Sequence, residues 1–406
     1  MPEQIVSRIL GLGGYQVVRT KFNERRSELA LWVRPTGTKA LRVCGSCGKG
    51  VWQTHSHRVR WIRDLPWGQW KVWLVVEVHR LPCPRCGVTT EEIHFLDGKL
   101  RSTRRLCEAV SRDCEDAPVQ RVAAKWGIPA TTVRRMDKRV LSRWSAKRKR
   151  RKLRWMGVDE IFWKKGECLT VVSDLDAGEP IWAAPERKKE TLDRFFTEVL
   201  TGRRRKWVEA VCVDMWEPYL QSIRQHLPEA AIVFDKFHVM KHVNAAVDET
   251  RRAEFFRLGG AMRGVIRGKR WLFLTRWGNL TRSQRGRLNE VFALNRRLFK
   301  AYVLKEQIEH LWTYSYEGAV RRFLANWILS IRWQRLPAFH KLATTLVRHL
   351  DGILAYCHHK VPFGLVEAIN ANIRSMIRRG RGYRDHDYLI LKVRKSTAQA
   401  RLLRAA

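Results

Sequence analysis

The stretch LRWMGVDEIFW (153–163) is followed by GECLTVVSDLDAG (166–178) and PIWAAPE (180–186). Each stretch is apolar and is joined to the next by a short turn, which predicts three successive β-strands. The pattern then alternates between helix and strand, with the segments ETLDRFFTEVL (190–200), VEAVCVDM (208–215), EPYLQSIRQHL (217–227) and AAIVFD (230–235). Antiparallel strands followed by strand–helix–strand units predict a mixed α/β sheet.

Two matched cysteine pairs stand in the first segment, 1–100, which is otherwise strand-like, with a hairpin pattern and turn within 61–80. In each pair two residues separate the cysteines and a glycine follows the second. Two such turns can complete a tetrahedral zinc site. Disulfides are not expected in a reducing compartment. We therefore predict a structural Zn²⁺ held by Cys44, Cys47, Cys83 and Cys86. The alternative is four ordinary buried thiols.

A pair of short helices is predicted in 101–152, which ends in the basic run 147–152. The stretch PVQRVAAKWGIPATTVRRMDKRV (118–140) has two helical patterns around a turn at Gly127, which is typical of a helix-turn-helix. The predicted DNA contacts are Thr131, Thr132, Arg134, Arg135 and Lys138 of the second helix and Arg148 and Arg150 of the basic run. The alternative is an ordinary helical hairpin with a solvated basic face.

The charge of the chain points to a polyanionic partner. Lys and Arg number 79 against 39 Asp and Glu, a formal net charge of +40. Cations gain affinity for nucleic acid by displacing counterions, so double-stranded DNA is the expected partner. A basic protein of the membrane surface or the ribosome is the alternative. We expect no membrane partner, because no run of about 20 apolar residues is present. The acidic Glu3 makes a poor secretory signal, so a cytoplasmic, nucleoid-associated protein is expected.

Three separated acids lie at or near the ends of apolar elements. Asp159 ends WMGVD, Asp214 ends VEAVCVD, and Glu367 lies on the helix pattern GLVEAINANIRSMIRR, taken as the final helix. Carboxylates are preferred ligands of Mg²⁺ (or Mn²⁺), and phosphoryl transfer between DNA oxygens uses two such ions. On the same helix, Asn370 and Arg374 extend a polar stripe from Glu367 and would meet DNA phosphate.

Each acid also has a simpler explanation. Asp214 with Glu217 fits a capping box. Asp235 fits the cap of a following helix. Asp159 would pair with one of the many cations, and Glu367 would be a solvated helix residue.

Several motifs occur together in a fixed order along the chain. They are the two cysteine pairs with HRVRWIRDLP (57–66), the helix-turn-helix, GVDE (157–160), VDMW (213–216) with Tyr219, FDKFHV (234–239), and GLVEAIN (364–370) with RRGRGY (378–383). In this combination the chain resembles the bacterial ISL3 family of insertion-sequence transposases, a part of the DDE group.

The resemblance implies an RNase-H-like catalytic core in 153–240 and 361–406, interrupted by an all-helical insertion, 241–360. It implies catalytic Asp159, Asp214 and Glu367 with Mg²⁺ as the working metal. Asp235 and His238 match a further family motif, which makes Asp235 a reserve metal ligand. The insertion departs from the family in its richness in Arg and Trp.

The resulting hypothesis is a transposase that binds terminal inverted repeats, cuts at the element's end and transfers the freed 3′-OH to target DNA, as a homodimer or larger assembly on DNA. A nuclease or a serine or tyrosine recombinase is a rival, and a recombinase would form a covalent protein–DNA adduct. The other rival is a domesticated regulator with a zinc module and a helix-turn-helix that no longer cuts DNA. All three acids are present, which favours the active enzyme.

Overall fold

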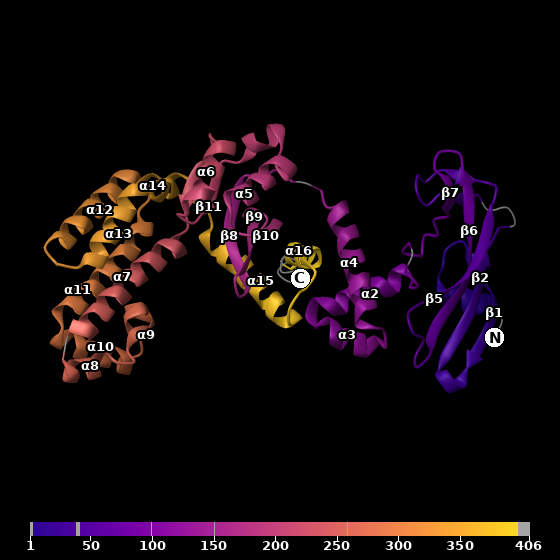
Figure 1. The fold of residues 1–406 in the computed structure, drawn as a ribbon, viewed down its shortest axis with the longest axis horizontal. Helices are drawn as coiled ribbons and strands as arrows, with labels where there is room; N and C mark the ends of the chain where they lie inside the picture. Colours follow the sequence, from indigo (N-terminus) through magenta and orange to yellow (C-terminus); the bar gives the residue numbers. More distant parts are fainter. Residues whose placement is uncertain (1–2, 38–40, 99, 150, 258, 397–406) are drawn as a thin grey trace. The chain divides into compact units, whose positions relative to one another are not determined.

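The computed structural model describes residues 3–37, 41–98, 100–149, 151–257 and 259–396 (Figure 1). The predicted DNA contact Arg150 lies outside the described residues. The chain forms two compact units, Met1–Arg148 with Arg379–Gly382, and Lys149–Arg378 with Tyr383–Ala406. Among the described residues, no helix is both long and apolar enough to cross a membrane.

The first unit contains a five-stranded sheet in the order β1-β2-β6-β5, with β7 paired to β6. Helix α1 (Glu3–Leu10) precedes the strands β1 (Tyr15–Asn23), β2 (Glu28–Pro35), β5 (Ser56–Arg63), β6 (Lys71–Cys83) and β7 (Gly87–Thr90). A separate small hairpin is formed by β3 (Arg42–Val43) and β4 (Gly50–Val51). Alternate residues of β6, from Val72 to Val78, are buried on one face, as the period of a strand requires.

Three helices complete the first unit: α2 (Arg104–Asp116), α3 (Val119–Trp126) and α4 (Ala130–Lys147). The buried carboxylate of Asp64 accepts hydrogen bonds from the Thr103 hydroxyl (2.7 Å) and the Arg105 guanidinium (2.8 Å). Arg105 also donates to the carbonyl of Leu10 at 2.7 Å. These bonds fix the helices to the sheet, so the predicted segment 1–100 and residues 101–148 of the next one lie in one compact unit, while 149–152 belong to the second.

The second unit is built on a mixed sheet in the order β10-β9-β8-β11-β12. Its strands are β8 (Trp155–Lys164), β9 (Glu167–Asp174), β10 (Glu179–Pro185), β11 (Ala210–Val213) and β12 (Ala231–Phe234). The first three pair antiparallel, and β8, β11 and β12 pair parallel. The predicted mixed α/β sheet is confirmed.

Helices cover both faces of this sheet (Figure 1). On one face, α5 (Lys189–Arg194) and α6 (Glu217–His226) pack their apolar residues against alternate residues of β8 and β11. On the other face, α15 (Phe363–Gly380) and α16 (His386–Lys395) do the same. The helix of Glu367 is therefore followed by one more helix, which corrects the prediction that it is the last.

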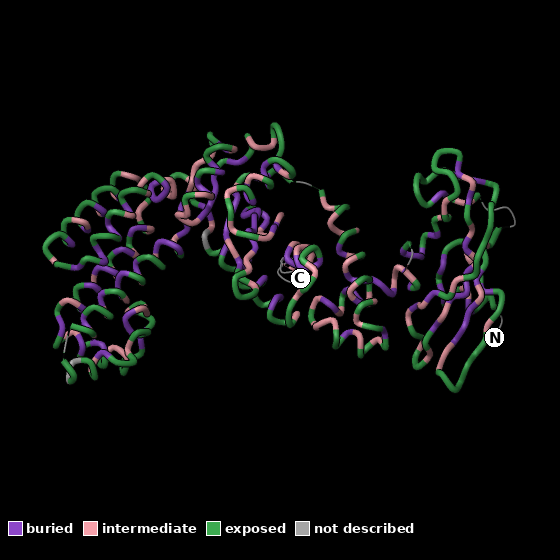
Figure 2. The backbone as a smooth tube through the Cα atoms, in the orientation of Figure 1, coloured by how far each residue is buried: buried purple, intermediate pink, exposed green. Residues whose placement is uncertain are grey.

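A helical region connects β12 to α15. Its helices are α7 (Lys236–Arg257), α8 (Gly260–Ile266), α9 (Arg270–Leu274), α10 (Arg282–Leu294), α11 (Arg296–Ile308), α12 (Glu317–Arg332), α13 (Pro337–Arg348) and α14 (Leu350–His358). Buried residues run without a break from the sheet into these helices (Figure 2). Helix α7 begins immediately after β12, earlier than residue 241, so the region continues the sheet's core.

Candidate active site and zinc cluster

Three aspartates are aligned at one edge of the second sheet. In the parallel strands β8, β11 and β12, the Cα partners are Gly157, Cys212 and Val233. Two residues further along the chain from each partner stand Asp159, Asp214 and Asp235. They therefore occupy equivalent positions at the carboxyl edge of the parallel strands, where open α/β sheets bind their ligands.

Asp159 lies in the middle of β8, within the strand predicted over 153–163, and the strand continues past the shorter segment WMGVD that Asp159 ends. The antiparallel hairpin of β8 with β9 continues to Lys164, whereas the pairing of β8 with β11 ends at Gly157. Asp159 is 9% exposed, and its carboxylate accepts a hydrogen bond from the Glu160 N–H at 2.8 Å. Its second oxygen accepts a hydrogen bond from the side-chain amide of Asn370 on α15.

His238 stands between two of the aspartates. Its Nε2 atom is 3.7 Å from Asp159, and its Nδ1 atom is 3.7 Å from Asp235. Burial lowers the pKa of this imidazole, but the carboxylates of Asp235, Asp159 and Asp214 outweigh burial and raise the pKa above its usual value. Burial raises the pKa of Asp159 to about 6, against the opposing charge of His238. The site is therefore crowded with negative charge that a cation would relieve.

Asp214 follows β11 and is fixed by two contacts. Its carboxylate accepts a hydrogen bond from the Met215 N–H at 2.7 Å and lies 3.4 Å from the guanidinium of Arg187. Arg187 also lies 3.4 Å from Glu160 and stacks over the ring of Trp216, with 4.3 Å to its centroid. The N-cap of α6 is Trp216, without a side-chain bond, so the capping-box explanation of Asp214 is wrong.

Asp235 does begin a helix. Its carboxylate accepts a hydrogen bond from the Phe237 N–H at 2.9 Å, as the capping explanation predicts for the start of α7. The same carboxylate faces His238, so this aspartate has a structural role and also belongs to the aligned acids.

Glu367 is carried by α15, which lies against β8. Val366 and Ile369 are buried against the sheet, as the helical spacing predicts. Asn370 is also buried and bonded to Asp159, so this member of the predicted polar stripe does not face DNA phosphate. Glu367 and the predicted DNA contact Arg374 are exposed.

Glu367 is not gathered with the aspartates into a closed ligand cluster. Among the described residues, two groups of potential ligands have donor atoms that all lie within 4.8 Å of one another: Cys44, Cys47, Cys83 and Cys86, and His57, Glu77 and His79. Asp159, Asp214 and Glu367 form no such group. Asp159 and Asp214 thus share an edge of the sheet, and the side chain of Glu367 is exposed on α15.

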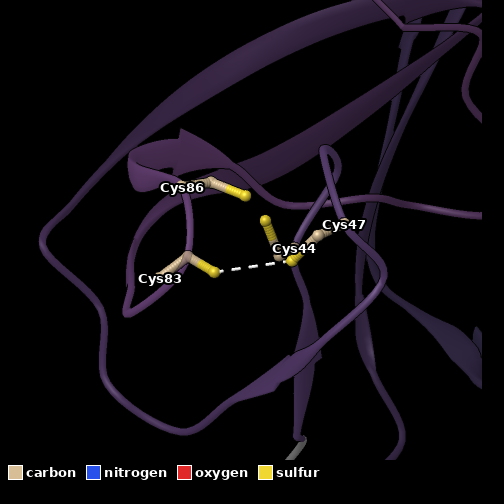
Figure 3. Close-up of side chains that lie close together, drawn as sticks. All are labelled: Cys44, Cys47, Cys83 and Cys86. Atoms are coloured by element: carbon tan, nitrogen blue, oxygen red, sulfur yellow. Dashed lines mark hydrogen bonds between the residues drawn. The ribbon is translucent and has the colours of Figure 1, made fainter.

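The four cysteines converge in the first unit (Figure 3). The sulfurs of Cys47 and Cys83 are 3.6 Å apart. One pair lies at the β3–β4 hairpin and the other at the β6–β7 hairpin, so the ligands are brought together from two turns. This convergence of the predicted cysteines is confirmed. Four thiolates in this arrangement fit the tetrahedral coordination of zinc.

Backbone contacts hold the two cysteine hairpins side by side. Gly45 N–H donates to the Thr90 carbonyl at 3.1 Å, and Glu92 N–H donates to the Val43 carbonyl at 2.8 Å. A Cβ atom at Gly45 would lie 2.7 Å from that Thr90 oxygen, so only glycine allows the approach. The neighbouring thiols raise the pKa of Cys86 to about 12, chiefly through the contact with Cys47. Such crowding of sulfurs favours a bound cation.

Helices α3 and α4 are joined by the predicted turn. Gly127 ends α3 with a φ of 56°, a left-handed conformation that glycine adopts readily. Val122, Val133 and Met136 are buried together in one core cluster, as the packing of two short helices around this turn requires. The predicted DNA contacts on α4 divide into exposed residues, Thr131 and Arg135, and half-buried ones, Thr132, Arg134 and Lys138. Arg148, at the end of α4, stacks over Trp144.

One residue of the site was missed by sequence reasoning, and another was assigned a different role. Arg187 follows β10 and carries no motif, and its contacts with Glu160 and Asp214 depend on the order of strands in the sheet. Asn370 lay in a recognised motif, but its burial against Asp159 could not be read from helical spacing.

Comparison with known proteins defines the class as transposase. Residues 156–393 match a family model described as a transposase of the ISL3 type, and residues 40–86 match the zinc-finger of the transposases of IS204, IS1001, IS1096 and IS1165. The chain belongs to the ISL3 family of transposases and is a DNA transposase with an N-terminal zinc ribbon.

Named relatives agree with this family over most of their length. The chain is 33% identical over 400 residues to the transposase for insertion sequence element IS1001 of Bordetella parapertussis, covering 97% of this chain and 98% of the relative. It is 29% identical over 387 residues to the transposase for insertion sequence element IS1557 of Mycobacterium tuberculosis, covering 88% and 86%.

Proposed function

We propose that the chain is a DDE transposase whose Asp159, Asp214 and Glu367 cut and join DNA at the ends of an insertion sequence. The sheet order β10-β9-β8-β11-β12, with helices on both faces, supports an RNase-H-like core. The observation that carries the proposal is the hydrogen bond from Asn370 to Asp159, which ties the helix of Glu367 to the strand of Asp159. Glu367 stands three residues before Asn370 on that helix.

The donor set fits hard divalent cations such as Mg²⁺ or Mn²⁺. Asp159 and Asp214 offer carboxylate oxygens at one sheet edge, Glu367 would complete the set, and Asp235 is a reserve ligand. Burial raises the pKa of Asp159 despite the opposing charge of His238, so a bound cation would favour the ionised carboxylate. When bound, two such cations would lower the pKa of a coordinated water molecule and would stabilise the attacking and leaving oxygens.

The surrounding residues prepare these acids. Asn370 fixes the orientation of the Asp159 carboxylate, and Arg187 holds Asp214 beside Glu160. His238 lies between Asp159 and Asp235, where it reduces the electrostatic repulsion between the two carboxylates. Water would then hydrolyse the phosphodiester at the element's end, which leaves a 3′-OH on the element and a 5′-phosphate on the flanking DNA. That 3′-OH would attack a phosphodiester of the target and form a new phosphodiester as the target's 3′-OH leaves.

The first unit would select the DNA ends. Cys44, Cys47, Cys83 and Cys86 would hold a structural Zn²⁺, and α3 with α4 would act as a helix-turn-helix whose second helix enters the major groove. Bringing two inverted repeats together calls for a homodimer or a larger assembly on DNA.

The proposal is tested by replacing Asp159 with Asn in a cleavage assay with a duplex that contains the terminal inverted repeat. We expect cleavage and strand transfer to fall by at least about 100-fold, while zinc content and DNA affinity are kept. Asp176→Asn, at an exposed aspartate after β9, is the matched control and should cut normally. Cleavage by a correctly folded Asp159→Asn protein would overturn the assignment.

A further inference from the structure

A basic groove lies within the first unit, between its sheet and the turn that joins α3 to α4. Its volume is about 780 Å³. The lining includes Arg26, Trp61, Arg63, Arg101, Thr132 and Arg135. The sheet and the loop after it therefore share one surface with the beginning of α4.

The walls of this groove are held in place by Arg63. Its guanidinium donates to the carbonyls of Trp126 at 2.9 Å and Gly127 at 3.3 Å, and it lies over the ring of Trp73, 5.8 Å from the centroid. The strand β5 is thus bonded directly to the α3–α4 turn. Because these hydrogen bonds join its two walls, the groove is a fixed feature of the first unit.

Positive charge dominates the groove. Arg26, Arg101 and Arg135 are exposed, and in the described part of the chain none of their side chains has an ion-pair partner. Glu28 is the single acid among the lining residues. Exposed guanidinium groups without an ion-pair partner are suited to bind phosphate oxygens.

The start of α4 adds to this field. Pro129 is the N-cap of this 18-residue helix and makes no side-chain cap bond, and Pro129 and Thr132 both line the groove. The N-terminus of a helix attracts anions. Trp61 is 49% exposed and offers an apolar surface for a deoxyribose.

We propose that this groove binds the sugar–phosphate backbone of one DNA strand next to the base pairs that α4 contacts. The sheet of the zinc-binding part and the helix-turn-helix then form one continuous surface that binds the same duplex. This inference rests on the proposed role of α4 in DNA binding, and it extends that role to residues on the sheet, Arg26 and Arg101, that the sequence did not single out.

The test compares two double variants of the full-length, zinc-loaded protein. Arg26→Ala with Arg101→Ala removes two groove cations, and Arg25→Ala with Arg112→Ala removes two exposed cations outside the groove. Binding is measured over a range of salt concentrations on two duplexes, one with the terminal inverted repeat and one of random sequence. Each phosphate contact contributes about 0.9 to the slope of log affinity against log salt.

We expect the groove variant to bind both duplexes roughly 10-fold more weakly and its salt slope to shrink by about 2, with little change in the control. The double variant Arg26→Lys with Arg101→Lys should keep most of the salt slope. Equal losses of affinity and salt slope in the groove and control variants would contradict the proposal that the groove binds DNA. A wild-type protein that does not prefer the inverted repeat would instead count against the proposed function, because the groove is judged on the random duplex as well.

Discussion

At the scale of single residues, Asp159 is held in an environment that opposes its charge. Its pKa in the folded protein is about 6, against 3.8 for an ordinary aspartate. Between these values the native protein holds more protons than the unfolded chain, so stability falls as the pH rises through this interval. The penalty at neutral pH is at most about 3 kcal/mol.

Asp159→Asn should therefore stabilise the protein in buffer without Mg²⁺ or Mn²⁺. The gain should be small at pH 4 and grow to between about 1 and 3 kcal/mol at pH 7, because only the wild-type carboxylate is ionised there. Urea unfolding at the two pH values measures the difference. Added Mn²⁺ should stabilise the wild type and leave the variant unchanged. A gain that is the same at both pH values would contradict the explanation by charge.

Asn370 offers a second test at this scale. Its amide fixes the Asp159 carboxylate but, in our proposal, touches no metal. Loss of such a supporting bond usually weakens metal affinity roughly 10- to 100-fold. Asn370→Ala should raise the Mn²⁺ concentration needed for half-maximal cleavage by that factor, with a smaller effect at saturating Mn²⁺. Asn372→Ala, at an exposed position of the same helix, should behave as wild type.

At the scale of elements, the placement of α15 on β8 depends on Gly157. A Cβ atom there would lie 2.9 Å from Leu175 and 3.2 Å from Val366 of α15. Gly157→Ala should cost about 1–3 kcal/mol of unfolding free energy through overpacking and should lower cleavage by displacing Glu367. Gly364→Ala, in open space on α15, is the control and should be neutral or slightly stabilising. Equal stability of the two variants would show that α15 tolerates a shift.

The elements also show how far the sequence alone leads. Local patterns predicted the strands β8 to β12, the α3–α4 turn at Gly127 and the convergence of the cysteine pairs, because alternation, glycine conformation and ligand spacing are properties of short segments. The bridging role of Arg187 was not predicted. It depends on which strands become neighbours, and no short segment contains that information.

At the scale of the whole molecule, the zinc cluster belongs to the first unit and the aligned acids to the second. Cys83→Ser should reduce bound zinc from about one per chain to none and open the cysteine hairpins to protease, since metal binding contributes directly to the folding of such modules. DNA binding should be lost with it. Metal analysis with limited proteolysis measures this. Cys168→Ser, in β9, should keep its zinc, and retained zinc in Cys83→Ser would contradict the four-cysteine site.

The order of segments along the chain has a consequence for protein synthesis. The zinc cluster, α3 and α4 leave the ribosome first, followed by the strands of Asp159, Asp214 and Asp235. Glu367 comes only after the helices α7 to α14 have been made. In the proposed function, a nascent chain would therefore be able to bind DNA before it was able to cut it, because domains generally fold in the order of their synthesis.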